Sequence, residues 1–355
     1  MLIDIEQLVN VESPSHDVAA VTASAAAVAD VITRRVGSAP ALIDSPAGPH
    51  VHWRTEGEPR VLLVGHHDTV FPLGALASRP FTVADGRATG PGVFDMKGGI
   101  VVGVHALASL ADASGVELLI TADEEVGSGA SRALIEERAR ACGAVLVLEP
   151  SADGGALKIG RKGVGTFQVV ITGRGAHAGL EPENGVNALI EAAHQVLDIT
   201  ALAAPDVGTT VTPTIASAGT ADNVVPAGAT LRIDVRVTSM GEARRIEAAM
   251  AALNPHDSSA SIVVSGSINR PPMAEDASAE LFEVARKTAA DAGLAAVLGV
   301  SVGGGSDGNF TAAIGVPTLD GLGVVGGGAH ADHEWLDVSS LPARAALLAA
   351  LIAAI

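Results

Sequence analysis

The sequence predicts an α/β protein: a mainly parallel sheet flanked by helices, interrupted by a smaller ferredoxin-like β-α-β-β-α-β domain. Short apolar runs alternate with helix-length segments up to about residue 160, which is typical of a sheet covered on both faces. After Arg161-Lys162-Gly163 the order changes to strand, helix, two strands, helix and strand. From Pro271 the first rhythm resumes. One α/β domain therefore carries an insertion.

The elements before the insertion follow from apolar spacing. Asp17–Val36 is rich in Ala and Val and lacks internal Gly or Pro, as a helix requires. Val61–Val64 is a short apolar run that ends at Gly65, which is typical of a buried strand. The remaining expected elements are a helix at 98–110, strands at 117–121 and 144–148, and a helix at 130–141 between them.

The insertion and the closing stretch are interpreted in the same way. Val164–Thr172 has the composition of a strand, and Val186–Ile199 has the spacing of an amphipathic helix. The insertion also contains predicted strands at 209–217, 230–238 and 261–264 and a helix at 242–253. The closing stretch contains predicted helices at 277–292, 308–314 and from Ser339, and strands at 296–300 and 316–319. We expect a catalytic domain at 1–163 and 270–355 and an inserted domain at 164–269.

Composition excludes several classes of protein. A length of 355 residues fits two domains, and 48% hydrophobic with 17% charged residues is a globular composition. The formal net charge of −18 repels nucleic acid and anionic membranes, and 2% aromatic residues without Tyr offer few platforms for base stacking. We therefore expect neither nucleic acid nor a membrane as a partner.

Targeting and redox signals are also informative. The single cysteine, Cys142, excludes an internal disulfide framework and a Cys-rich zinc module. The N-terminus carries Asp4 and Glu6 where a signal peptide needs basic residues, and the apolar stretches near 100–111 and 345–355 are too short to span a bilayer. These features predict a soluble, cytoplasmic protein.

Candidate metal ligands follow the predicted strands. Catalytic groups in open α/β sheets gather beyond the carboxyl ends of the strands. His66, Glu125 and Glu149 follow three such strands, Asp95 precedes a helix, and His330 follows the Gly-rich loop after the last strand. Imidazole and carboxylate ligands without thiolate fit a hydrolytic zinc, cobalt or manganese site.

The number of ligands favours two ions. One catalytic zinc takes three protein ligands and a water, whereas two metals that share a bridging carboxylate need five protein ligands. Asp68, two residues after His66 in an extended segment, points the same way and can accept a proton from its non-ligating nitrogen. Glu124 and Glu125 project differently, so one of them can bind a metal while the other stays free as a general base. Without a cation, these acids would repel one another.

Two alternatives come from other classes. Gly304-Gly305-Ser306-Asp307-Gly308 matches G-x-S-x-G, with acids and His330 downstream, so a serine hydrolase that uses Ser306 is the remote alternative. It leaves the dense acids at 95–149 unexplained. The other alternative is a metal-binding or scaffold protein without activity; the presence of Glu124 argues against it.

The sequence resembles the dinuclear-zinc exopeptidases and deacylases that include glutamate carboxypeptidase, acetylornithine deacetylase, succinyl-diaminopimelate desuccinylase and aminoacylase. The matching stretches, in the family's order, are 65–70, 90–99, 121–128, 148–150 and 328–332. The motifs at 161–163, 177–179, 303–307 and 330–335 look most like the glutamate carboxypeptidase branch.

The resemblance implies a role for each ligand. His66 and Glu149 would hold one Zn²⁺ ion, Glu125 and His330 the other, and Asp95 would bridge them, with Co²⁺ or Mn²⁺ as alternative metals. The family often has a cis peptide bond after the bridging Asp and a second Asp there, whereas this chain has Met96.

The resemblance also implies the reaction. Asp68 would orient His66, and Glu124 would serve as base for a metal-bridging hydroxide that attacks an amide bond beside a C-terminal amino acid with a free carboxylate. An N-acyl-amino-acid deacylase of the acetylornithine deacetylase or desuccinylase type is the alternative. The substrate would then be a small peptide or an N-acyl amino acid.

The insertion matches the family's lid, which is also its dimerisation domain, so the resemblance implies a homodimer. His177 would reach the partner subunit's active site and stabilise the developing oxyanion. The residues expected to contact substrate are Asn223, Arg236, Lys162, Arg161 and, in a Gly-rich loop whose backbone N–H groups suit an anion, Gly305 and Ser306, with Arg270 as a further candidate.

Overall fold

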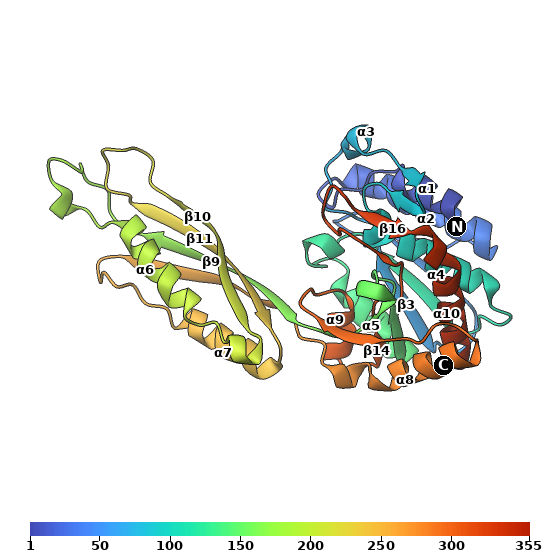
Figure 1. The fold of residues 1–355 in the computed structure, drawn as a ribbon. Helices are drawn as coiled ribbons and strands as arrows, with labels where there is room; N and C mark the ends of the chain where they lie inside the picture. The colour runs from blue at the N-terminus through green and yellow to red at the C-terminus, as the bar shows by residue number, and fades with distance from the viewer. The chain divides into compact units, whose positions relative to one another are not determined.

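The computed structural model describes residues 1–355, which divide into two compact units (Figure 1). The large unit contains residues 1–160, 273–302 and 306–355, and the small unit contains residues 161–272 and 303–305. None of their helices combines the length and the apolar character that a membrane span needs.

A six-stranded sheet lies at the centre of the large unit, in the order β1-β2-β6-β3-β7-β14. The parallel strands are β3 (Val61–His66), β6 (Val116–Thr121), β7 (Ala144–Val147) and β14 (Thr318–Leu319). At one edge, β2 (His50–Arg54) runs antiparallel to β6, and β1 (Ala41–Ile43) runs antiparallel to β2. The prediction of a mainly parallel sheet is confirmed.

Helices cover both faces of this sheet (Figure 1). In β3, Val61 and Leu63 belong to one apolar core, and Leu62 and Val64 belong to the other, because successive strand residues point to opposite faces. The first core is completed by α1 (Leu2–Val9), α2 (Val18–Val36), α4 (Gly98–Ser109), α8 (Ala279–Asp291) and α10 (Leu341–Ala354). On the second face lie α5 (Arg132–Cys142) and α9 (Gly308–Ala313). Burial on both sides explains why the strands are continuous apolar runs.

Smaller elements complete the large unit. An antiparallel sheet contains β15 (Gly326–Gly327), β16 (Trp335–Asp337), β5 (Arg87–Thr89) and β4 (Thr82–Ala84), and a short helix, α3, spans Ala75–Ser78. A further pair joins β8 (Leu157–Arg161), which reaches the start of the small unit, to β13 (Gly299–Val302). The strand predicted at 296–300 is wrong at its start, since β13 begins only at Gly299.

The small unit has one antiparallel sheet in the order β10-β11-β9-β12. Its strands are β9 (Gly163–Thr172), β10 (Thr210–Ala218), β11 (Gly228–Val237) and β12 (Ser261–Arg270). Two helices, α6 (Ala188–Thr200) and α7 (Met240–Ala251), pack on one face around Phe167, Ile233 and Ile246. Their order along the chain is β-α-β-β-α-β.

The chain enters and leaves the small unit at neighbouring positions. Val164 in β9 lies opposite Arg270 in β12 in the register of the two strands. The two strands approach so closely that a Cβ on Gly163 would lie 2.8 Å from the carbonyl oxygen of Arg270. A segment of more than a hundred residues therefore begins and ends at almost the same place.

Candidate metal centre

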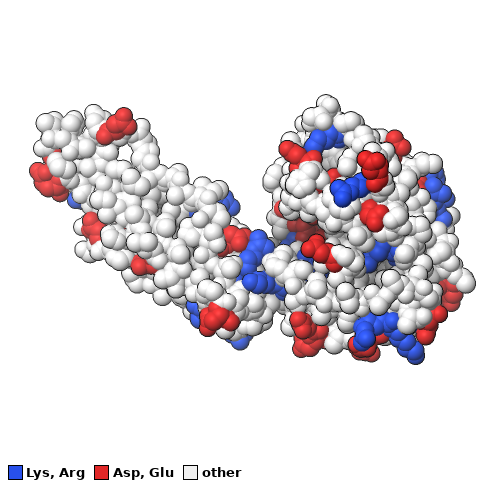
Figure 2. All heavy atoms as spheres, viewed as in Figure 1, with Lys and Arg blue, Asp and Glu red and all other residues white.

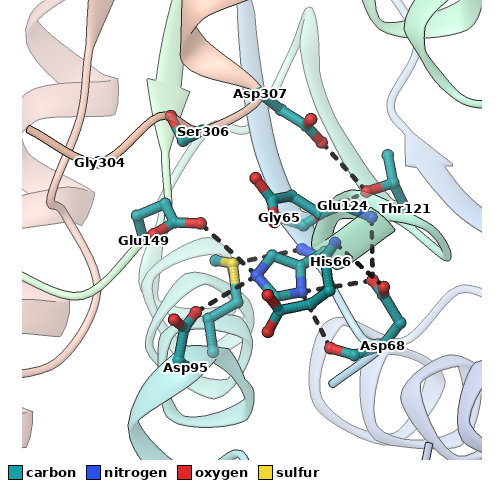
Figure 3. A network of polar contacts seen from close by, with 12 residues as sticks. Gly65, His66, Asp68, Asp95, Thr121, Glu124, Glu149, Gly304, Ser306 and Asp307 are labelled. Carbon is teal, nitrogen blue, oxygen red and sulfur yellow. Dashed lines mark hydrogen bonds and ion pairs between the residues drawn. The ribbon is translucent and has the colours of Figure 1, made fainter. Parts of the chain in front are cut away.

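The predicted ligands meet at the carboxyl ends of the parallel strands, where Figure 3 labels His66, Asp95 and Glu149. His66 is the last residue of β3, and Glu149 follows two residues after the end of β7. Glu125 lies on a 3₁₀ turn, Glu124–Val126, that follows β6. The topology of the parallel sheet places these three residues at one edge.

Asp95 lies between two pairs of ligands. Its Oδ1 is 3.3 Å from His66 Nε2, and its Oδ2 is 3.4 Å from His330 Nε2. His66 Nε2 also lies 3.5 Å from Glu149 Oε1, and His330 Nε2 lies 3.1 Å from Glu125 Oε2. Each histidine thus has one carboxylate of its own, and the two histidines share Asp95.

These residues fit divalent cations. The buried oxygens Asp95 Oδ1 and Glu125 Oε1 have no hydrogen-bond partner, although buried polar atoms are normally satisfied. Ligand atoms of His66, Asp95 and Glu125 lie within 4.8 Å of one another, and so do those of His66, Glu124 and Glu149. Imidazole and carboxylate donors of this kind suit zinc, cobalt or manganese.

The pKa shifts of the proposed ligands also indicate that their carboxylates require a positive charge nearby. Bonds to Asp95 and Glu125 raise the pKa of His330 to about 10. Burial lowers the pKa of His66, but its contacts with Asp68, Asp95 and Glu149 outweigh burial and raise it well above its usual range. Burial raises the pKa of Glu125. In the protein alone the imidazoles hold protons where a cation would otherwise balance the carboxylates.

Asp68 supports two parts of the site. The ring Nδ1 of His66 lies 3.0 Å from the backbone carbonyl oxygen of Asp68 and 3.4 Å from its carboxylate Oδ1. The carboxylate accepts the backbone N–H groups of Glu124 and Glu125, each at 3.2 Å, and the hydroxyl of Ser15 at 2.6 Å. Asp68 therefore orients His66 mainly through its backbone, while its side chain holds the turn that carries Glu124 and Glu125.

Three further residues near the ligands were not assigned a role from the sequence. The sulfur of Met96 accepts the backbone N–H of His66 at 3.3 Å, and the Asp95–Met96 peptide bond is cis, as the resemblance implied. Lys97 is buried and donates to the carbonyl of Val11 at 2.8 Å, and burial lowers its pKa to about 8. Glu334 is buried against the Asp95 segment. Only their position inside the matched motifs, at 90–99 and 330–335, could have drawn attention to them.

The Gly-rich loop at 303–308 is held by hydrogen bonds from Ser306 to residues that follow the loop. Ser306 is fully buried; its hydroxyl donates to Asp320 Oδ2 at 2.6 Å, and its backbone N–H donates to Asn309 Oδ1 at 2.9 Å. A nucleophile needs exposure and a histidine partner, whereas His330 contacts Asp95 and Glu125 instead. This geometry argues against the serine-hydrolase alternative and assigns the polar groups of Ser306 to the loop.

His177 and Asn223 lie on adjacent exposed loops of the small unit. The carbonyl of Asn223 accepts the backbone N–H of Ala178 at 2.9 Å. His177 Nδ1 accepts the N–H groups of Gly179 and Leu180 at 3.1 and 3.2 Å. Because Nδ1 is the acceptor, a neutral His177 carries its proton on Nε2, where it can donate a hydrogen bond.

The predicted cationic residues of the small unit make contacts inside that unit. Arg161 is buried, and its Nη1 donates to the carbonyls of Gly304 and Gly305 at 3.1 and 3.2 Å. Lys162 Nζ donates to the carbonyl of Gly208. Arg236 forms a two-bonded ion pair with Asp234, at 2.9 and 2.8 Å.

Comparison with known proteins matches residues 62–354 to the model of peptidase family M20/M25/M40. The chain is 34% identical over 370 residues to carboxypeptidase G2 of Pseudomonas sp. (strain RS-16), covering 98% of this chain and 87% of that protein. It is 30% identical over 329 residues to a succinyl-diaminopimelate desuccinylase of Xanthomonas oryzae pv. oryzae, covering 84% and 85%. Among solved structures, the aminopeptidase PepT of Bacillus cereus has a similar fold, with a TM-score of 0.77 and 23% identity over 99% of this chain and 97% of that one.

Proposed function

Because the chain belongs to peptidase family M20/M25/M40 and is a metallopeptidase or amidohydrolase, we propose that it hydrolyses the amide bond beside a C-terminal amino acid with a free carboxylate. The observation that carries the proposal is the position of Asp95, whose two carboxylate oxygens face His66 and His330. A shared carboxylate between two histidine–carboxylate pairs suits two ions in each subunit, and we take these to be Zn²⁺, with Co²⁺ or Mn²⁺ as alternatives.

Glu124 acts as the general base in this proposal. When bound, the ions would lower the pKa of a water and polarise the scissile carbonyl. Glu124 takes a proton from the attacking water and delivers it to the leaving nitrogen, so the products are a carboxylic acid and an amine, which ionise to a carboxylate and an ammonium group in neutral water. The contacts of Asp68 with the N–H groups of Glu124 and Glu125 support this role, because they fix the turn on which the base lies.

His177 donates a hydrogen bond to the oxyanion. Its Nδ1 is occupied by two backbone N–H groups, which leaves the proton on Nε2 for this purpose. His177 is exposed on the small unit, as a residue that meets a second subunit must be. The free carboxylate of the substrate is recognised by the positive residues Arg161, Lys162 and Arg236 together with Asn223 and the backbone at Gly305.

In this proposal the protein forms a homodimer through its small unit. Leu189, Ile190 and Leu197 on α6 expose 52%, 58% and 69% of their surface, although side chains of this kind are normally buried. Figure 2 shows that much of the small unit's surface on the face drawn is uncharged. β10 is an outer strand of its sheet and has unpaired backbone groups along one side. Sedimentation tests the dimer; a chain that remains monomeric at high concentration contradicts it.

A matched pair of substrates tests the reaction. The metal-depleted protein, reloaded with Zn²⁺, Co²⁺ or Mn²⁺, is given an N-acylated dipeptide with a free C-terminal carboxylate and the same dipeptide with a C-terminal amide. We expect hydrolysis of the acid only, and only after a metal is added. Hydrolysis without metal, or equal rates for the acid and the amide, would contradict the proposal.

The identity to desuccinylases favours a second candidate, an N-acyl-amino-acid deacylase. The same assay separates the two when N-acetyl and N-succinyl amino acids are added to the set. If the acyl group of these compounds is released faster than the dipeptide is cleaved, the deacylase is favoured. The proposed metal site would remain valid in that case.

A further inference from the structure

The carboxylate of Glu334 is bonded to the segment that carries Asp95. Glu334 is 1% exposed. Its Oε2 accepts the backbone N–H of Gly92 at 2.8 Å, and its Oε1 accepts those of Phe94 and Asp95 at 2.9 and 2.8 Å. One buried carboxylate thus takes three N–H groups from four consecutive residues, which end at the shared ligand.

Backbone hydrogen bonds in this segment run from the N–H groups of Lys97 and Gly98 to the carbonyls of Gly92 and Val93, and they leave unused the three N–H groups that Glu334 accepts. Gly92 has φ of +72°, and a Cβ there would lie 2.6 Å from Thr69 Cγ2, so only glycine fits. Asp95 and Met96 have non-helical backbone angles inside a wide helical turn, Val93–Lys97. Backbone N–H groups buried in such a segment need acceptors from elsewhere in the chain, and Glu334 provides them.

Glu334 also belongs to the loop that carries His330. It lies four residues after His330, and its own N–H donates to the carbonyl of Ala331 at 3.1 Å, which closes the end of that loop. The same residue therefore joins the loop of one histidine ligand to the segment of the shared carboxylate.

We infer that Glu334 is a positioning residue of the metal centre, which holds Asp95 in place to face both histidines and ties its segment to the His330 loop. The inference rests on the proposed two-metal site. A carboxylate suits this position because it only accepts hydrogen bonds, whereas a glutamine would turn one N–H₂ group towards backbone N–H donors. Asp68 makes the same kind of contact with the Glu124–Glu125 turn, so each of these two ligand segments is held by a buried carboxylate.

The variant Glu334→Gln tests the inference, with Glu191→Gln as the matched control. Glu191 is a buried carboxylate of the small unit that accepts the N–H groups of His256 and Asp257, each at 3.0 Å, far from any ligand in the sequence. Zinc affinity is measured by competition with a chromophoric chelator. We expect Glu334→Gln to weaken the binding of both ions by about 10- to 100-fold, the range seen when partners behind metal ligands are changed. Glu191→Gln should bind zinc as the unaltered protein does.

Hydrogen exchange on the metal-free protein provides a second readout. The amides of Gly92, Phe94 and Asp95 should exchange slowly in the unaltered chain and faster in Glu334→Gln, while those of the small unit stay unchanged. Fast exchange of these amides in the unaltered protein overturns the inference, even if neither variant folds.

The outcomes separate this inference from the proposed function. If the unaltered protein binds none of Zn²⁺, Co²⁺ and Mn²⁺, the proposed function fails, and hydrogen exchange alone decides the role of Glu334. If it binds two ions and Glu334→Gln binds them equally well, the positioning role is wrong and the metal site stands. Glu334→Asp, which keeps the charge on a shorter side chain, should give an intermediate zinc affinity; an affinity below that of Glu334→Gln would contradict the role assigned to the charge.

Discussion

The two units place their proposed functional side chains differently. In the large unit, His66, Asp95 and Glu149 lie in buried or nearly buried positions and contact other polar side chains, and His330, although half exposed on a loop, is held by Asp95 and Glu125. In the small unit, His177 and Asn223 lie on exposed loops above a core of aliphatic residues. A metal site needs ligands that are held before the ion arrives, whereas groups on loops can meet a substrate or a second subunit. The difference suggests that metal binding and substrate recognition can be changed separately.

Among the variants that would sharpen this comparison, we expect the largest effect on the rate of hydrolysis when the general base, Glu124, is replaced. Replacing Glu124 by Ala should lower the rate of hydrolysis by about 100- to 10,000-fold, the usual contribution of a general base. The fold and both metals should remain, since the five ligands are intact. Steady-state kinetics and metal analysis check the two halves of this expectation.

Glu137→Gln is the control for Glu124→Ala, because the side chain of Glu137 is 70% exposed and lies on α5. It should leave turnover unchanged. Unchanged turnover in Glu124→Ala would refute the role of Glu124 as base.

A smaller effect is expected for the small unit. His177→Ala should reduce kcat by about 100- to 1,000-fold, as the loss of one oxyanion donor does, and leave the zinc content at the level of the unaltered protein. Loss of zinc from this variant would show that metal binding and the role of the small unit cannot be changed separately. An unchanged kcat would show that His177 takes no part in the reaction.

The smallest effect concerns a buried charge away from the ligands. Glu117 in β6 accepts hydrogen bonds from Arg138 and lies 2.8 Å from His52 Nε2. Burial raises the pKa of Glu117, but Arg138 and His52 outweigh burial and lower it below its usual range. Glu117→Gln should lower the free energy of unfolding by about 2 kcal/mol at neutral pH, the size of a hydrogen bond to a charged group.

The pH dependence of this loss gives the check. A carboxyl with a lowered pKa stabilises the fold above its unfolded pKa, and the stabilisation disappears as pH falls through the folded pKa. Urea unfolding of Glu117→Gln and the unaltered chain should therefore differ less at acid pH than at neutral pH. A difference that grows in acid would contradict the assigned direction.

Much of the large unit could be predicted because its strands are buried on both faces. The runs at 61–64 and 144–148 are continuous and apolar, the run at 117–121 is apolar between Glu117 and Thr121, and each became a parallel strand. β2 was missed because His50, His52 and Arg54 break its apolar pattern, which a strand near an edge tolerates. The second half of β12 was missed for a related reason: Ser265, Gly266 and Ser267 carry no apolar alternation, and the strand is defined by its pairing with β9.

The metal ligands could be predicted because parallel strand ends converge, so their meeting depends on topology alone. Glu334 could not, since its partners Gly92, Phe94 and Asp95 are backbone groups about 240 residues away, and no spacing rule connects them. For Ser306, in contrast, the sequence suggested more than the structure supports. Its motif suits a nucleophile or a substrate contact, but only tertiary structure reveals that Asp320 and Asn309 take its polar groups.

The adjacent entry and exit of the small unit have a consequence for how such a chain can be rearranged. With Val164 opposite Arg270, a tight turn could bridge the ends left by deleting everything between them, and a shorter loop is cheaper in entropy to close. The truncated polypeptide would keep His66, Asp95, Glu125, Glu149 and His330. Other inserted domains could be exchanged at this junction without changing any of the five proposed metal ligands.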